Sequence, residues 1–168
     1  IQTEYRQQFK NSYFRTDFSF NKKDSTNSHF FATMESDLED SFYEVKIETV
    51  SNKDYLKRYQ IQSPLVNSYS VLNSSLALEK YSDDYNFSSS INIIEDLSKT
   101  GSDKYEYVFP SYDFNKEKDL NSSLFDKFNI NSSGSYRKYN TNIDEVDIVN
   151  DFVFNSNNQD KLSIADID

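Results

Sequence analysis

The sequence predicts an all-β fold, an antiparallel meander of about eight long strands, and two observations support this prediction. Apolar or aromatic residues alternate with polar residues over much of the chain, most clearly between Tyr105 and Phe154. This two-residue period is typical of strands whose two faces meet different environments. Short polar connections separate the alternating segments, as expected of strands joined by hairpins in series.

The expected strands follow one another without a repeat of fixed period. One unusually long strand is expected first, and residues 42–50 alternate most cleanly, with Tyr43, Val45 and Ile47 opposite Glu44, Lys46 and Glu48. Pro64 stops any strand in the irregular stretch 51–64, and Pro110 is expected to break the strand at residues 105–114. The predicted strands are residues 5–21, 29–38, 42–50, 69–81, 85–93, 105–114, 128–137 and 146–154.

The predicted connections are polar. They comprise a turn at residues 21–27, tight turns at 39–40 and 83–84, loops at 98–104, 115–121 and 140–144, and a weakly structured tail from residue 156. Strands of about nine to fourteen residues suit a tilted crossing of a membrane and are long for a soluble sandwich.

Composition narrows the classes of function. The 168 residues fit one domain and include 14 Phe and 13 Tyr but no Trp, together with many Asn and Ser. Strands of this composition suit a surface partly in contact with lipid or with other aromatic rings. A net charge of −10 argues against a phosphate-binding surface, which needs clustered Lys and Arg, and therefore against a nucleic-acid partner. The absence of cysteine removes disulfides and thiolate metal sites.

The sequence contains neither a signal peptide nor an apolar run long enough for a spanning helix. It starts at Ile1 and stops in mid-pattern at Asp168. We therefore expect residues 1–168 to be a single partial domain, an internal piece of a longer protein.

The residues that could carry chemistry predict no catalytic, cofactor or metal site. Asp37, Glu44 and Glu48 lie on polar strand faces, where solvated or ion-paired roles are expected. His29 is the only histidine and is expected at an interface or on the surface. With two glycines and one histidine we expect no phosphate loop, nucleophile elbow or histidine-containing triad. Residues 142–147 have calcium-like spacing but lack the glycine and glutamate of an EF-hand loop, so they are expected to run into a strand.

Residues 54–59 combine two tyrosines with two cations. They could form a functional clasp, or a surface loop whose tyrosines pack on the neighbouring strand. The residues alone favour the loop.

Four segments resemble one family. Residues 48–59 (Glu-Thr-Val-Ser-Asn-Lys-Asp-Tyr-Leu-Lys-Arg-Tyr) resemble the S-D-x-x-Y-L-x-x-Y stretch of the lipopolysaccharide (LPS)-assembly outer-membrane protein family LptD, in its alphaproteobacterial form. Residues 105–114 are similar to the family's lPxxxPxxxy segment, although its first proline is absent. Residues 134–142 and 149–152 resemble the strand-loop-strand that follows. Residues 4–6 and 31–38 fit the family's order, and Ser and Asn replace many of its glycines.

This resemblance implies the early part of a large transmembrane β-barrel in the cell outer membrane. In the family, the barrel follows a periplasmic jelly-roll domain, encloses the plug lipoprotein LptE and passes LPS to the outer leaflet. The implied partners are LPS, an LptE-like plug, periplasmic bridge components and outer-membrane lipid, with no cofactor and no nucleic acid. The protein would be a conduit rather than an enzyme.

Two alternatives remain from the residues alone. A soluble or surface-attached β-sandwich, such as an adhesin-like binding module, needs one face of each strand to pack into a dry core. Polar residues on the apolar faces, Ser89, Ser132 and Asn150, weaken this alternative slightly. A β-sheet enzyme acting on polysaccharide is disfavoured because no acid-base constellation is recognisable.

Overall fold

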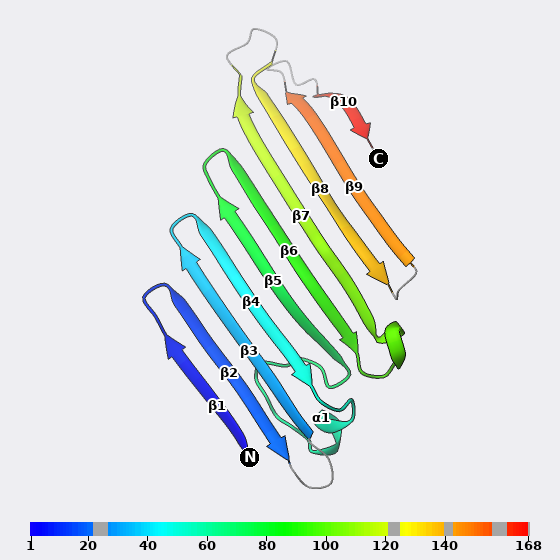
Figure 1. The fold of residues 1–168 in the computed structure, drawn as a ribbon. Helices are drawn as coiled ribbons and strands as arrows, with labels where there is room; N and C mark the ends of the chain where they lie inside the picture. Colours follow the sequence, from blue (N-terminus) through cyan, green and yellow to red (C-terminus); the bar gives the residue numbers. More distant parts are fainter. Residues whose placement is uncertain (22–26, 121–124, 140–142, 156–160, 168) are drawn as a thin grey trace.

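The chain forms one ten-stranded antiparallel sheet in which every strand pairs with its neighbours in sequence (Figure 1). The computed structural model describes residues 1–21, 27–120, 125–139, 143–155 and 161–167. The strands are β1 (Gln2–Gln8), β2 (Ser12–Asn21), β3 (Asn27–Leu38), β4 (Ser41–Val50), β5 (Val71–Tyr81), β6 (Tyr85–Asp96), β7 (Tyr105–Asp119), β8 (Lys127–Tyr139), β9 (Ile143–Asn155) and β10 (Lys161–Ile167). Two short helices, α1 (Tyr55–Arg58) and the 3₁₀ helix η1 (Gly101–Lys104), lie in connections.

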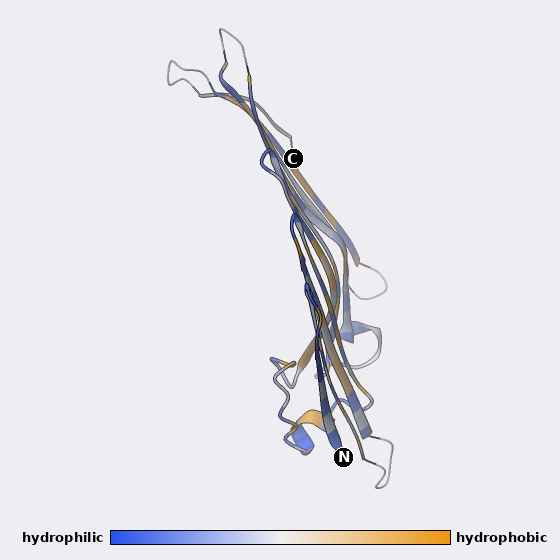
Figure 2. Cartoon of the chain, turned by 90° about the vertical axis from the view of Figure 1, so that its left-hand side faces the viewer, coloured by the Kyte–Doolittle hydropathy of each residue, from blue (hydrophilic) through white to orange (hydrophobic). Residues whose placement is uncertain are grey.

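The predicted all-β meander is confirmed, and the sheet is open. Strands β1 and β10 stand at the two ends of the strand order, and within the described residues each pairs with one neighbour. Viewed from its side, the sheet is a single layer (Figure 2).

The first predicted strand is wrong in its extent, because residues 5–21 contain a chain reversal. The Phe9 amide donates to the Ser12 carbonyl at 2.8 Å, which closes a hairpin between β1 and β2. Lys10 and Asn11 form this turn, which contains neither glycine nor proline and has Asn11 as its one usual turn residue.

The loop predicted at 115–121 is wrong over residues 115–119, because β7 runs to Asp119, whereas the break predicted at Pro110 interrupts the pairing without ending the strand. Pro110 lies where the pairing of β7 shifts register against both β6 and β8. A bulge leaves a residue outside the ladder, so the missing N–H of proline costs no ladder bond there. Residues 115–119 pair with 127–131 of β8.

The polar tail was expected to be weakly structured, but residues 161–167 form β10 and pair with β9. Residues 156–160, and much of the turns predicted at 21–27 and 140–144, lie outside the described residues. The described residues therefore form ten strands where about eight were predicted.

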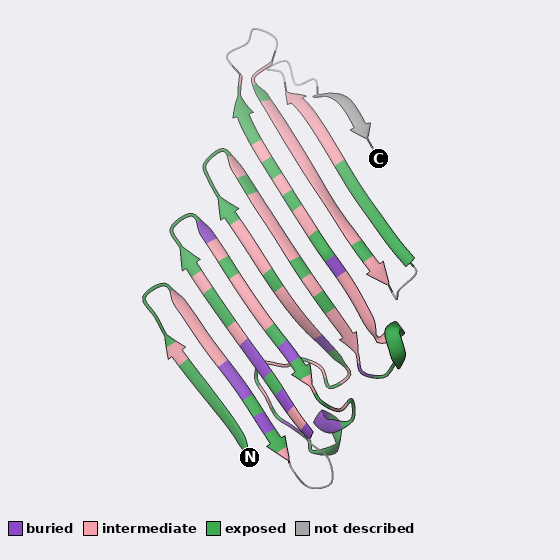
Figure 3. Ribbon diagram, in the orientation of Figure 1, coloured by how far each residue is buried: buried purple, intermediate pink, exposed green. Residues whose placement is uncertain are grey.

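A small hydrophobic core lies at one end of the sheet. Residues 51–70, which we call the strap, connect β4 to β5 and cross over one face of β3 and β2 (Figures 1 and 2). Most of the buried positions gather at this end (Figure 3). The core consists of Phe31 from β3, Tyr55, Leu56 and Ile61 from the strap, Leu72 at the start of β5, and Leu97.

Local hydrogen bonds shape the strap before it packs. The Asn52 side-chain oxygen accepts from the Asp54 amide at 2.9 Å and starts the single turn of α1. Gln60 has φ of 47°, and the Ile61 amide bonds the Leu56 carbonyl at 3.0 Å, which ends the turn. The predicted packing of this segment on the neighbouring strand holds for Tyr55, which is buried.

We predict that Leu56→Ala loosens the strap without unfolding the sheet. Leu56 is fully buried, so the lost contacts and the cavity cost about 2–5 kcal/mol. Amide hydrogen exchange should accelerate in residues 51–70 and stay unchanged in β6. The control Leu76→Ala removes a half-exposed side chain away from the strap and should not change exchange there. Equal exchange in both variants would show that this core does not hold the strap.

Candidate functional site

The strand register gives the sheet two faces of different chemistry. On one side, which we call the apolar face, a row of directly paired residues crosses five strands: Phe14, Met34, Val45, Leu76 and Ile91. Met34 and Leu76 are 43% and 49% exposed. Tyr5, Phe18, Phe20, Phe30, Tyr43, Ile47, Ile93, Val146 and Ile148 are further exposed apolar or aromatic side chains on this face.

The opposite side, the polar face, carries hydroxyls, amides and charges at the matching positions. One directly paired row there consists of Glu35, Glu44, Ala77, Ser90, Ser111 and Ser135. Continuous apolar patches larger than a few hundred Å² are rare on soluble monomers and mark surfaces that contact lipid or another protein. The two faces therefore suit two different environments.

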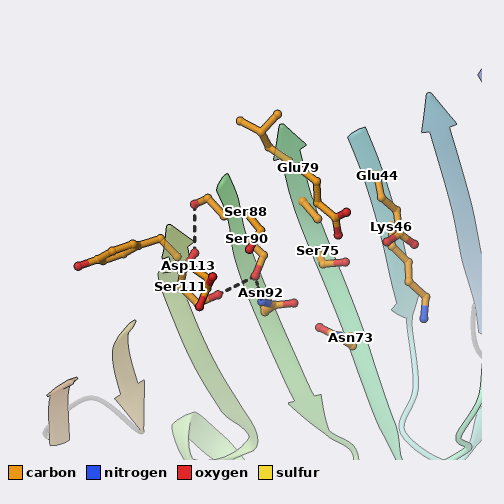
Figure 4. A pocket seen from close by; sticks show the side chains of 14 residues that line it. Glu44, Lys46, Asn73, Ser75, Glu79, Ser88, Ser90, Asn92, Ser111 and Asp113 are labelled. Atoms are coloured by element: carbon orange, nitrogen blue, oxygen red, sulfur yellow. Dashed lines mark hydrogen bonds between the residues drawn. The ribbon is translucent and has the colours of Figure 1, made fainter. Parts of the chain in front are cut away.

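The polar face is hollowed across β4 to β7 (Figure 4). A shallow depression of about 550 Å³ lies there, with Ser75, Ser90, Asn92 and Ser111 among its lining residues. Asn92 donates from its side-chain amide to the Ser90 hydroxyl at 3.0 Å, and the Ser90 and Ser111 hydroxyls lie 2.7 Å apart. The depression offers donors and acceptors to water or to a polar solute.

A chain of buried polar groups anchors the strap to the polar face. The Tyr55 hydroxyl lies 2.7 Å from the Ser19 hydroxyl, which lies 2.8 Å from His29 Nδ1. His29 Nε2 lies 3.3 Å from Asp17 Oδ1. The Gln2 amide donates to both Asp17 oxygens, at 3.2 and 3.0 Å, and to the Gln62 carbonyl of the strap at 3.1 Å.

This arrangement corrects two expectations. His29 is buried beneath the strap, stacked on Phe31 with ring centroids 4.5 Å apart, and is not a surface residue. Ser19, His29 and Asp17 also form a serine–histidine–aspartate chain, which a single histidine was not expected to allow. Ser19 is only 4% exposed and its oxygen contacts Tyr55, so the chain in this conformation presents no nucleophile to a substrate. Its geometry fits an anchor.

The three carboxylates singled out in the sequence are not brought together. Asp37 is exposed beside the β3–β4 turn, and Glu44 lines the depression. Glu48 is buried near the far end of β4, where its Oε1 lies 2.6 Å from the Lys46 ammonium, as the expected ion pairing requires. The other Glu48 oxygen accepts from the backbone N–H of Asn73 at 2.8 Å, close to the point where the β4–β5 ladder ends at Lys46 and Ser75.

Within the residues that the structure describes, no group of three or more His, Cys, Asp or Glu side chains could hold a metal ion. Of the calcium-like stretch, residue 142 lies outside the described residues, and Ile143 begins β9 as the predicted run into a strand requires.

A glycine notch fixes the packing of the apolar face at β7 and β8. Gly134 pairs with Tyr112, and a Cβ atom placed on Gly134 would lie 2.8 Å from the Tyr112 ring and 2.9 Å from the Asp147 carbonyl oxygen. The Tyr112 hydroxyl lies 3.4 Å from Ser132, which donates to the Asn150 side-chain oxygen at 2.7 Å. Ser132 and Asn150, two polar residues on the apolar face, are thus hydrogen-bonded to each other.

We predict that Tyr55→Phe weakens the anchor by about 1 kcal/mol, because it removes one buried hydrogen bond and leaves the ring in place. The measurement is the protease concentration needed to cut residues 51–70. Tyr59→Phe, at the exposed neighbouring ring, is the matched control and should change nothing. If the strap of Tyr55→Phe resisted the protease as well as the native strap, the hydrogen bond of Tyr55 would not anchor it.

We predict that Gly134→Ala lowers the free energy of unfolding by about 1–3 kcal/mol, because the added methyl group overlaps a ring and a backbone oxygen. Ser133→Ala, one residue away on the other face, is the control in the same denaturant titration. Equal stability of the two variants would show that the notch tolerates a side chain.

No helix among the described residues is long and apolar enough to cross a membrane. Comparison with protein-family models, with curated proteins and with solved structures finds no match to this chain.

Proposed function

We propose that this chain forms part of the wall of an outer-membrane β-barrel that assembles LPS into the outer leaflet. The observation that carries the proposal is the two-faced sheet, a meander compatible with a β-barrel membrane protein. In the proposed arrangement the apolar face contacts lipid and the polar face lines a wet lumen.

The dimensions and the backbone support a membrane location. Strands β2 to β9 have 10–15 residues, and about 9–11 residues suffice for a tilted crossing. The antiparallel ladders between neighbouring strands supply hydrogen-bond partners to backbone N–H and C=O groups, which lipid tails cannot supply. A closed barrel has no free edges, so the proposal requires β1 and β10 each to pair with a further strand.

The LPS-assembly activity rests on the ordered family resemblance. The first resembling stretch ends in the strap, and the second begins β7 and includes its bulge. The third begins in β8 and the fourth lies in β9. In this proposal LPS crosses the lumen, an LptE-like plug lipoprotein occupies it, and periplasmic bridge components deliver the cargo. The protein acts as a conduit.

Depletion of the protein in its own Gram-negative cell tests the activity. The proposal expects the protein in the outer-membrane fraction, and newly made LPS should stop reaching the cell surface, as measured by surface labelling. A protein that fractionates with soluble or secreted material would instead favour the β-sandwich binding module. Normal surface LPS after depletion would overturn the LPS-assembly activity.

We predict that Leu76→Arg prevents stable membrane insertion whereas Ser75→Arg does not. Neighbouring side chains on β5 point to opposite faces, and arginine facing lipid near mid-bilayer costs about 2–4 kcal/mol. The measurement is the folded fraction in membranes, read from the gel mobility of unheated samples. An equal loss for both variants would contradict the assignment of the two faces.

A further inference from the structure

The cations of this chain fall into two groups. In the strands, most lysines and arginines whose side chains are described form ion pairs with carboxylates. Examples are Arg15 with Glu4, Lys46 with Glu48, and Arg137 with Glu106. Three cations of the strap, Lys53, Lys57 and Arg58, are exposed and have no ion pair within the described residues. We call these three residues the cationic tip.

Neighbouring carboxylates do not neutralise the cationic tip. Lys53 lines a hollow of about 290 Å³ together with Glu95. Glu95 already accepts from Lys104 at 2.7 Å, a hydrogen bond that raises the pKa of Lys104 and keeps it charged. Asp96 lies 3.6 Å from Lys99. Asp54 is the one carboxylate inside the stretch 53–58, so this stretch keeps a net positive charge in a chain whose net charge is −10.

The tip stands on a rigid base. Tyr55 and Leu56 lie between its members in sequence and are 3% and 0% exposed. The bond from Tyr55 to Ser19 and the contacts of Leu56 in the core fix α1 over the polar face. The adjacent Tyr59 ring is partly exposed and lies 5.1 Å, centroid to centroid, from Tyr55. Because the backbone that carries the three cations is fixed, binding an anion orders their side chains but not the segment itself.

We propose that Lys53, Lys57 and Arg58 form a binding site for phosphate groups carried by a glycolipid saccharide. Ammonium and guanidinium groups make charge-assisted hydrogen bonds to phosphate oxygens, and arginine can do so with two N–H groups. The partly exposed Tyr59 ring offers an apolar surface beside them for a sugar. The identity of the ligand as LPS rests on the proposed function, whereas the phosphate chemistry rests on the tip itself.

The test uses the full protein in neutral detergent and three probes. They are fluorescent LPS with its lipid A phosphates, the same LPS after enzymatic dephosphorylation, and inorganic phosphate as competitor. The test variant is Lys53→Gln/Lys57→Gln/Arg58→Gln. The matched control is Lys10→Gln/Lys116→Gln/Lys118→Gln, which removes the same charge from cations without an ion pair at the opposite end of the sheet.

The expected result is a loss of affinity of about tenfold for phosphorylated LPS in the test variant only, since each exposed charge contributes about two- to fivefold. Binding of dephosphorylated LPS should be equally weak in all three proteins. An equal loss in both triple variants would mean general attraction of charge and overturn the site. Competition by inorganic phosphate at the same concentration as LPS would overturn the glycolipid as ligand.

Failure of this site and failure of the proposed function give different results. If Leu76→Arg and Ser75→Arg behave alike in membranes, the barrel assignment fails whatever the tip binds. If they differ and the triple variant still binds phosphorylated LPS normally, only the cationic tip is wrong.

Discussion

A sheet of one layer cannot bury its own apolar face, and this constraint governs the rest of the molecule. Nine antiparallel ladders hold the strands in register, while the hydrophobic core of six side chains occupies one end only. Rows such as Phe14, Met34 and Val45 remain open on the other side. In the proposed arrangement lipid covers them, which would account for the strand lengths, the backbone pairing and the polar second face together.

The strap supplies what the sheet lacks, namely side chains that pack over one of its faces. It packs on the polar face around the aromatic ring of Phe31, and it bonds to Asp17 and Ser19 through Gln2 and Tyr55. Hydrophobic contacts and satisfied polar groups thus fix the same segment, which gives it one conformation. A segment fixed in this way can hold charges at a defined place above the polar face, which links the anchor to the cationic tip.

Most strands and their two faces could be predicted from the sequence, because alternation with a period of two residues identifies a strand and also assigns each side chain to a face. Residues 42–50 illustrate this. The sequence was insufficient where backbone geometry departs from the usual signals. The turn at Lys10 and Asn11 has neither glycine nor proline, and Pro110 is accommodated by a bulge that needs both neighbouring strands. Neither fact can be read from one strand alone.

The anchor beneath the strap was missed for a related reason. Ser19 and His29 are ten residues apart and meet because β2 and β3 pair antiparallel with these two residues directly opposite each other. The predicted antiparallel pairing of the two strands could have indicated this contact. Burial by the strap could not have been found, because it depends on a long connection returning over the face.

The central claim is that one face meets lipid and the other meets water, and single cysteines along β6 test it most directly. The chain contains no cysteine, so each introduced thiol reports one position. In intact membranes a water-soluble maleimide should label positions 86, 88, 90 and 92 and spare 87, 89, 91 and 93, which a lipid-soluble reagent should label instead. Protection of the second set from both reagents would indicate a dry protein core and contradict the membrane account.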